Sequence, residues 1–294
     1  MFHKILVPLD GSAEAERALR PALKLARAVE GEVILLRNMK TVYMTLPAVA
    51  TEYNWSWPEY SREESREEVR HYLDGLISTY APTRVAMRAM AVDGDTASLI
   101  VDTAETEAVD LIVMSAKGWA SAKTRELGSI TERVLYGASC PVFMVRSELI
   151  KRVAVTLDGS ELAEQAVQPA FEISRGLGAE LTLLRVNEPL SSGYSAMQSD
   201  KERELSEWTR TTAMSYLEHI ARDLGGDVKL FVMEGTAVSN ILDFTKLHAI
   251  DLLVMSTHGR TGMRRWLYGS VTVKVMRESQ ASMLIVRPPG FQMN

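Results

Sequence analysis

The sequence repeats itself, and this duplication constrains the fold more than any other feature. Residues 4–12 read KILVPLDGS and residues 152–160 read RVAVTLDGS, an offset of 148 residues. From residue 94 onward the matching pairs lie 141 residues apart, as Gly128-Ser129 and Gly269-Ser270 do. The chain therefore holds two copies of one unit, and the first copy carries seven extra residues upstream of residue 94.

The length of 294 residues suits two domains, which we place at residues 1–147 and 148–294. With 46% hydrophobic and 24% charged residues, the composition is that of a globular chain and not of a disordered or collagen-like one. No apolar run approaches the roughly 18 residues that a membrane-spanning helix needs, and the apolar stretch before Asp10 is too short for a signal peptide. We therefore expect a cytoplasmic protein without a membrane partner.

Charge and cysteine content narrow the choice of partners. Because 33 Lys and Arg stand against 38 Asp and Glu, the net charge of −5 argues against non-specific binding to nucleic acid. The single cysteine, Cys140, excludes an intrachain disulfide, and the five histidines show no metal-ligand spacing. We expect no metal site and no nucleic acid, so the partner is a small molecule or another protein.

Each copy alternates short apolar runs with amphipathic stretches. In the first copy, residues 5–9 form an apolar run that leads through Asp-Gly-Ser into a helical pattern. Further strands are expected at 33–36, 85–92, 110–114 and 141–145. Strands that are apolar throughout and separated by helices indicate a parallel sheet covered on both faces. The predicted fold is α/β, with two tandem doubly wound, Rossmann-like domains of five parallel strands each.

One stretch lacks the hydrophobic period of a helix or a strand. Residues 41–68 carry three tyrosines and two tryptophans among prolines and charges, whereas their counterpart at 188–206 is polar and rich in serine. A lid or an interface is one interpretation of this stretch. The other, which we favour, is a surface excursion whose aromatic rings pack back on their own domain.

In a doubly wound sheet, a ligand binds beyond the carboxyl ends of the strands, where the strand order reverses. In each copy the first strand ends at an aspartate, and a glycine-bearing loop follows the fourth strand. The loops read MSAKG, nine residues and GSIT in the first copy, and MSTHG, nine residues and GSVT in the second. The candidate site residues are Asp10, Met114, Ser115, Lys117, Gly118, Gly128, Ser129, Ile130 and Thr131 in the first copy, and Asp158, Met255, Ser256, His258, Gly259, Gly269, Ser270, Val271 and Thr272 in the second.

A Gly-Ser pair at the start of a helix suits an anion. Glycine lets the backbone approach a phosphate without a Cβ, and the helix start offers free N–H groups at the positive end of its dipole. We expect Gly269 at positive φ, so that valine there would both fill the phosphate volume and strain the backbone. The plain alternative is that the glycines permit a turn and that Ser129 and Ser270 cap the helices. Asp10 and Asp158 likewise either accept hydrogen bonds from a ligand or cap the helices that follow them.

Rival motifs are absent. The sequence has no GxxxxGK[ST] loop and no GxSxG elbow, and Gly176-Leu-Gly178 lacks the third glycine of a dinucleotide-binding motif. Cys140 stands in SCPV at the start of a strand, where a small buried hydrophobe is the usual role.

Four segments agree in order and spacing with one family. ILVPLDGS at 5–12, CPVFMV at 140–145, DLLVMSTHGRTG at 251–262 and GSVT at 269–272 together resemble the universal stress protein family. Both halves match over nearly their whole length, so the chain looks like a tandem two-domain member. The resemblance implies ATP as the ligand, with Mg²⁺ left open as a companion ion, held by the pattern G-x2-G-x9-G-[S/T].

The two halves fit that pattern with one departure. Serine replaces its first glycine at Ser115 and Ser256, while the second and third glycines are present. At the position where the first half has Lys117, the second half has His258, the residue that is commoner in the family. We therefore expect two sites, and the second matches the family pattern more closely. Asp10 and Asp158 match the aspartate that lies beside the nucleoside in the family.

The resemblance implies an ATP-binding stress-response regulator that hydrolyses ATP slowly or not at all, because no dedicated base for the γ-phosphate is recognisable. A nucleotide-free member that acts as a protein-interaction scaffold is the alternative. An enzyme of the wider adenine-nucleotide hydrolase-like group is disfavoured because the loop SGGxDS is missing. The family also implies that the last strands, 141–145 and 283–286, meet across a pseudo-two-fold axis within one chain. The regulatory protein partner is unknown, and a homodimer of whole chains is left open.

Overall fold

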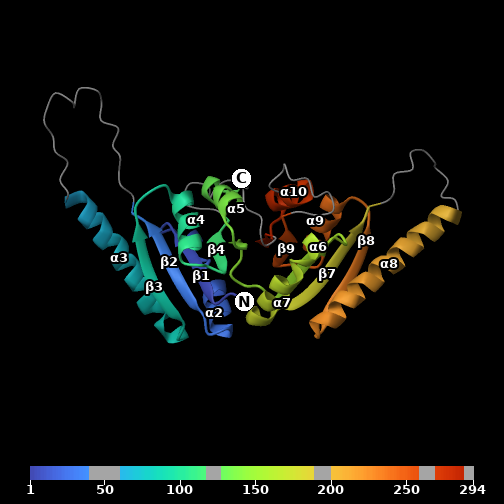
Figure 1. Cartoon of the computed structure of the whole chain (residues 1–294), viewed down its shortest axis with the longest axis horizontal. Coiled ribbons are helices and arrows are strands. Elements are labelled where there is room, and N and C mark those ends of the chain that lie inside the picture. The colour runs from blue at the N-terminus through green and yellow to red at the C-terminus, as the bar shows by residue number, and fades with distance from the viewer. Residues whose placement is uncertain (40–59, 117–126, 189–199, 258–268, 288–294) are drawn as a thin grey trace, which may run out of the picture.

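The computed structural model of the chain describes residues 1–39, 60–116, 127–188, 200–257 and 269–287. The ten strands in this part form one continuous sheet in the order β3-β2-β1-β4-β5-β10-β9-β6-β7-β8. Helices lie on both sides of the sheet, and the two halves stand side by side about its middle (Figure 1). The predicted α/β fold with five strands in each half is confirmed.

The elements follow one another as the repeat predicts. The first half contains β1 (Lys4–Leu9), α1 (Ala13–Glu16), α2 (Leu19–Ala28), β2 (Glu32–Asn38), α3 (Tyr60–Tyr80), the 3-10 helix η2 (Ala81–Thr83), β3 (Ala86–Val92), α4 (Thr96–Thr106), β4 (Leu111–Ser115), α5 (Ser129–Gly137) and β5 (Val142–Val145). The second half contains β6 (Arg152–Leu157), α6 (Glu161–Glu164), α7 (Val167–Leu177), β7 (Glu180–Asn187), α8 (Asp200–Leu224), β8 (Val228–Glu234), α9 (Ala237–Leu247), β9 (Leu252–Ser256), α10 (Ser270–Glu278) and β10 (Ser282–Val286).

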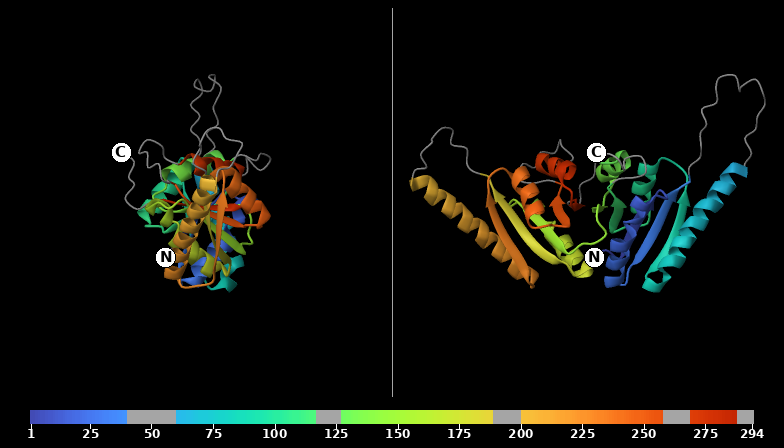
Figure 2. Two further views of the ribbon diagram at one scale, coloured as in Figure 1. Left: turned by 90° about the vertical axis from the view of Figure 1, so that its right-hand side faces the viewer. Right: turned by 180° about the vertical axis from the view of Figure 1, so that it is seen from behind.

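Alternate side chains of each strand enter two separate cores. In β1, Ile5 and Val7 pack with residues of α2 and α3, whereas Leu6 packs on the opposite face with residues of α4 and α5. The second half divides its helices in the same way, α7 and α8 on one face and α9 and α10 on the other, and Figure 2 shows both layers. Burial on both faces explains why the strands read as continuous apolar runs.

The first helix predicted in each half is divided in two. Between α1 and α2 the Ala18 N–H donates to the Ala15 carbonyl oxygen at 3.1 Å, which forms a short turn. Pro21 has no N–H, so the carbonyl oxygen of Arg17 cannot accept the bond that would continue the helical ladder. Pro169 repeats Pro21 and accounts for the same break between α6 and α7.

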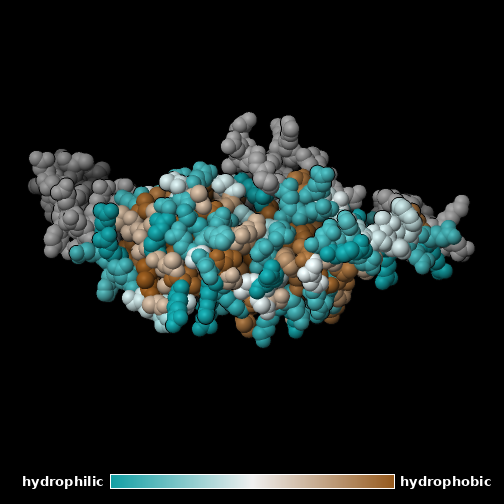
Figure 3. Space-filling view, turned by 60° about the horizontal axis from the view of Figure 1, so that its bottom comes forward, coloured by the Kyte–Doolittle hydropathy of each residue, from teal (hydrophilic) through white to brown (hydrophobic). Residues whose placement is uncertain are grey.

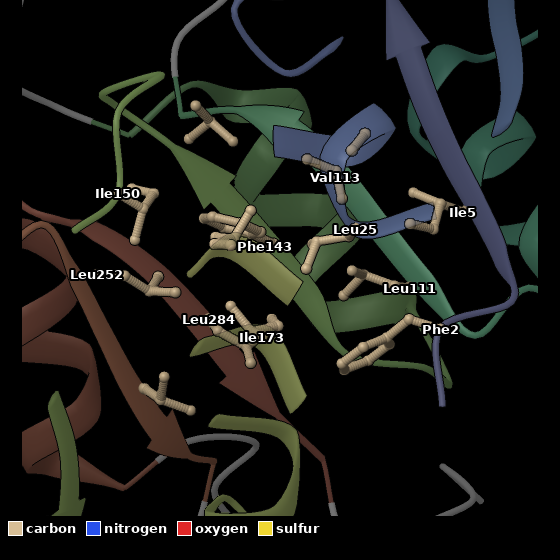
Figure 4. Packing of buried hydrophobic residues seen from close by; sticks show 14 of the residues in the cluster. Phe2, Ile5, Leu25, Leu111, Val113, Phe143, Ile150, Ile173, Leu252 and Leu284 are labelled. Atoms are coloured by element: carbon tan, nitrogen blue, oxygen red, sulfur yellow. The ribbon is translucent and has the colours of Figure 1, made fainter. Parts of the chain in front are cut away.

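The two halves join through their last strands. β5 and β10 pair antiparallel, with Phe143 opposite Leu284, and both side chains are fully buried. Figure 4 shows them in one cluster with Leu25 of α2 and Ile173 of α7. The predicted meeting of the last strands within one chain is confirmed. The pairing also covers two sheet edges that would otherwise present unpaired backbone groups.

The described part of the chain bears on the membrane and surface predictions. No helix in the described part of the chain is long and apolar enough to cross a membrane. The face in Figure 3 mixes hydrophilic and apolar side chains. Most of the aromatic stretch, residues 41–59, lies outside the described residues, so both interpretations of it stay predictions.

Candidate functional site

The strand order reverses beside β1 and beside β6. β1 pairs with β2 on one side and with β4 on the other, and β6 pairs with β7 and β9. The carboxyl ends of β1 and β4 therefore lie next to each other at a switch point. Asp10 follows β1 and Ser115 ends β4, so two predicted site residues stand at neighbouring strand ends, as Asp158 and Ser256 do in the second half.

Each aspartate holds the serine that lies two residues further on. Asp10 Oδ1 accepts hydrogen bonds from the N–H and the hydroxyl of Ser12, at 2.9 and 2.5 Å. Asp158 Oδ1 accepts the same two bonds from Ser160, at 3.0 and 2.6 Å. Ser12 and Ser160 are the N-caps of α1 and α6, and each accepts from the N–H three residues on. The capping interpretation of the aspartates is wrong, because serine fills that role.

The two ends of each glycine loop are hydrogen-bonded to each other. The Gly128 N–H donates to the Ala116 carbonyl oxygen at 3.2 Å, and the Gly269 N–H donates to the Thr257 carbonyl oxygen at 2.7 Å. Gly128 has a φ of −65° and Gly269 a φ of −61°. The expected positive φ is wrong. Both glycines adopt an extended conformation that any residue tolerates. A side chain here would therefore not strain the backbone, but it would occupy the space in front of the helix start.

Two threonines fasten the last helix of each half to the strand before the loop. Thr131 Oγ1 donates to the Ser115 carbonyl oxygen at 3.3 Å, and Thr272 Oγ1 donates to the Ser256 carbonyl oxygen at 3.0 Å. Both threonines are buried. Their hydroxyls therefore stabilise the fold, and only their backbone N–H groups remain as candidate donors to a ligand.

The starts of α5 and α10 place backbone donors that have no partner within their own helix at this edge of the sheet. In each helix the first internal bond runs from the fourth helical residue to the cap glycine, at 2.9 Å in α5 and 3.1 Å in α10. The N–H groups of 129–131 and 270–272 consequently have no partner within their helix. Ser129 and Ser270 are exposed first residues of the helices, and the caps are the preceding glycines, so the alternative that these serines cap the helices is wrong. Three such donors at the positive end of a helix dipole can hold an anion.

The remaining predicted residues divide into two groups. The side chains of Met114 and Met255 are buried in the core beneath α5 and α10, while Ile130 is exposed and Val271 half-buried at the helix starts. The other four predicted residues lie outside the described part of the chain: Lys117, Gly118, His258 and Gly259.

An arginine that was not predicted stands at the end of β2. The Arg37 guanidinium lies 4.3 Å from the centroid of the Tyr72 ring, and a Cβ on Gly11 would be 2.9 Å from its Nη2 atom. Gly11 has a φ of +84°, which favours glycine. The second half repeats the stack with Arg185 and Tyr216 at 4.9 Å. The repeated triplet LLR was the available signal, but its partners come from a distant helix.

Titratable side chains elsewhere offer little chemistry. Within the described ranges, no group of three or more His, Cys, Asp and Glu residues could hold a metal ion. Cys140 is half-buried and packs against the core beneath α4 and α5, so the predicted buried hydrophobe is confirmed only in part, and burial raises the pKa of its thiol to about 12.

Comparisons with known proteins agree with this duplicated architecture. The model of the universal stress protein family matches the chain twice, over residues 1–146 and 149–287. A universal stress protein of Methanothermobacter thermautotrophicus is 34% identical over 148 residues, which make up 50% of this chain and 97% of that protein. Another from Mycolicibacterium smegmatis is 25% identical over 297 residues and covers 97% of both chains.

Solved structures show the same fold. A universal stress protein from Archaeoglobus fulgidus superimposes with a TM-score of 0.68 at 20% identity, covering 98% of this chain and 97% of its own. A Pseudomonas aeruginosa structure gives a TM-score of 0.70 at 15% identity, covering 98% of this chain and 94% of its own. The family model matches both halves and the likeness extends over the full length: the chain belongs to the universal stress protein family.

Proposed function

We propose that each half binds an adenine nucleotide, ATP, at the carboxyl ends of its strands, and that the chain is a cytoplasmic stress-response regulator with slow or no hydrolysis. One observation carries the proposal. At each switch point a carboxylate follows the first strand, and the neighbouring fourth strand leads through the glycine loop to a helix start with three N–H groups that have no partner within the helix.

The helix starts and the aspartates suit different parts of the nucleotide, and this difference orients the ligand. The N–H groups of α5 and α10, at the positive helix ends, suit the phosphates. Asp10 and Asp158 would repel phosphate but accept hydrogen bonds from a ribose or base, so they belong at the nucleoside end. Bound ATP supplies a polyphosphate charge that alters this edge of the sheet, which a partner protein can read. Mg²⁺, where present, is held mainly through phosphate oxygens and needs no cage of protein ligands.

The experiment measures nucleotide directly. The purified chain is denatured and the released small molecules are identified by mass spectrometry, and calorimetry of nucleotide-free protein then gives the number of ATP sites. We expect adenine nucleotide in the supernatant and two sites per chain. Neither released nucleotide nor heat of binding with ATP, ADP or AMP would contradict the proposal and favour the protein-interaction scaffold.

A further inference from the structure

An arginine follows the last strand of each half and reaches into the other half. Arg146, after β5, donates from Nη2 to the Met276 carbonyl oxygen at 3.1 Å, and its Nη1 donates to a second carbonyl beyond the end of α10 at 3.0 Å. Arg287, after β10, donates from Nη2 to the carbonyl oxygens of Leu135 and Tyr136, both at 2.7 Å. Each arginine therefore binds the C-terminus of the last helix of the opposite half.

The two contacts are equivalent in the duplication. Val145-Arg146 and Val286-Arg287 lie 141 residues apart, and so do the accepting residues Leu135 and Met276. This is the offset that also relates the two glycine loops. The Arg146 side chain is half-buried, and burial lowers the pKa of its guanidinium. Its partners lie at the negative end of a helix dipole, where a cation is favoured.

The helices that these arginines hold are the two that begin at the proposed phosphate sites. In α5 the N-terminal end is fastened by Thr131 to a strand of its own half, and the C-terminal end is bound by Arg287. α10 is fastened by Thr272 and bound by Arg146 in the same way. A nine-residue helix is short and stiff, so a shift at its C-terminus is carried to its first N–H groups.

Each arginine is also joined to the loop of its own half. Val145, which precedes Arg146, accepts from the Ala116 N–H at 3.1 Å, and Ala116 accepts from the Gly128 N–H at 3.2 Å. The second half repeats these bonds at 3.0 and 2.7 Å. These bonds to the loop of the same half use the backbone of Val145 and Val286, so they do not depend on the arginine side chains, whereas the guanidiniums reach the opposite half.

We propose that each nucleotide site is completed by the opposite half: Arg287 is a positioning residue for the first-half site, and Arg146 is one for the second-half site. The inference rests on the proposed ATP binding. Without its guanidinium, the helix end loses charge-assisted donors, and the N–H groups at the other end lose the geometry that a phosphate requires. If the arginines only held the halves together, removal of either guanidinium would weaken both sites alike. If each positions the helix of the opposite half, its removal weakens only the site of that opposite half.

Background variants that keep only one of the two sites distinguish these outcomes; each is called a parent here. Gly269→Val removes the second site and leaves the first to be measured by calorimetry with ATP. In this parent we expect Arg287→Met to weaken binding about tenfold and Arg287→Lys to weaken it less, because lysine keeps the charge and one donor. Arg146→Met is expected to change the affinity by less than about twofold. In a Gly128→Val parent the two arginines exchange roles.

Arg20 supplies a matched control. Its Nε lies 3.3 Å from Glu148 Oε2, and the arginine belongs to α2 and has a side chain that is 72% exposed, so Arg20→Met should leave both affinities unchanged. Equal losses from Arg146→Met and Arg287→Met in either parent would overturn the inference, and so would the absence of any loss. Where a methionine variant does not fold, as judged by thermal unfolding, the lysine variants carry the same crossed comparison. A Gly269→Val parent that folds but binds no ATP, beside a wild type that also binds none, overturns the proposed function and this inference with it.

Discussion

Substitutions at the switch point can distinguish the contribution of a side chain to the fold from its proposed contribution to ligand binding. Asp158 Oδ1 accepts from Ser160, and an asparagine oxygen can accept the same two bonds. We therefore expect Asp158→Asn to unfold at nearly the same temperature but to bind ATP more weakly by about 1.5–3 kcal/mol, the contribution of a charged hydrogen bond. Asp10→Asn should do the same in the first half. Calorimetry and thermal unfolding of each variant measure the two effects.

Ser160→Ala is the matched control, because it removes the hydroxyl that caps α6 and donates to Asp158, while it keeps the carboxylate and the Ser160 N–H that also donates to it. It should cost about 1 kcal/mol of stability with little change in affinity. An Asp158→Asn variant with the affinity of the wild type would remove both aspartates from the site.

Gly269 tests the phosphate end of the same site. Its φ of −61° accommodates valine, so Gly269→Val should fold, while the branched side chain occupies the space beside the first N–H groups of α10. We expect the calorimetric stoichiometry to fall from two ATP per chain to one. Gly269→Ala should weaken the site without abolishing it. Two sites of unchanged affinity in the valine variant would contradict the loop assignment.

Cys140 gives the stability a dependence on pH. Burial raises its pKa to about 12 in the folded chain, against roughly 8.5 in an unfolded one. Between these values the folded thiol keeps a proton that the unfolded chain has released, so the free energy of unfolding falls as the pH rises. Urea unfolding at pH 7 and pH 10 should show a smaller alkaline loss for Cys140→Ala than for the wild type. Identical losses would show that the thiol does not contribute.

Among the elements, α10 depends on one buried hydroxyl. Thr272→Val preserves the shape of the side chain but removes the bond to the Ser256 carbonyl oxygen, which spans the loop. We expect a loss of about 1 kcal/mol in urea unfolding and weaker ATP binding, because the helix start is no longer fastened to β9. Thr245→Val is the control, because that buried hydroxyl bonds within its own helix, to Ile241 at 2.7 Å. Equal effects of the two variants on affinity would contradict this role for Thr272.

The elements also show which features a sequence can predict. Continuous apolar runs predicted the strands, because burial on both faces leaves that pattern along the chain. The break before α2 was missed because Pro21 is compatible with a first helical turn and interrupts only the ladder behind it. The stack of Arg37 on Tyr72 and the contacts of Arg146 and Arg287 were missed for another reason. They join residues far apart in the sequence, and no local spacing encodes them.

For the whole molecule, duplication places the two proposed sites at equivalent positions on one continuous sheet. α5 and α10 lie beside each other near its middle, and Arg277 of α10 comes within 3.5 Å of Glu132 of α5 (Figure 1). The helices that begin at the two proposed sites are therefore neighbours, although their sequences are 141 residues apart. If each half binds a nucleotide as proposed, both nucleotides lie at one edge of the sheet, where a single partner protein can contact them together.

The junction between the halves should survive cleavage of the chain. Phe143 and Leu284 are fully buried at the β5–β10 pairing, and α2 packs so tightly on α7 that a Cβ on Gly176 would lie 3.0 Å from Leu25 Cδ2. Polypeptides 1–147 and 148–294, produced together, should therefore form a one-to-one complex, because each exposes an apolar face and an open strand edge when alone. Sedimentation measures that complex.

Substitution at the centre of the junction distinguishes specific pairing from general adhesion. Leu284→Asp places an unpaired charge where no water reaches, so the complex of the two halves should dissociate. Leu247→Asp, at a side chain that is 80% exposed in the same half, should leave the complex intact. Halves that remain separate as wild type would contradict the pseudo-dimer. Halves that stay together with Leu284→Asp would show that contacts other than the β5–β10 pairing, the packing of α2 on α7 first among them, hold the molecule together.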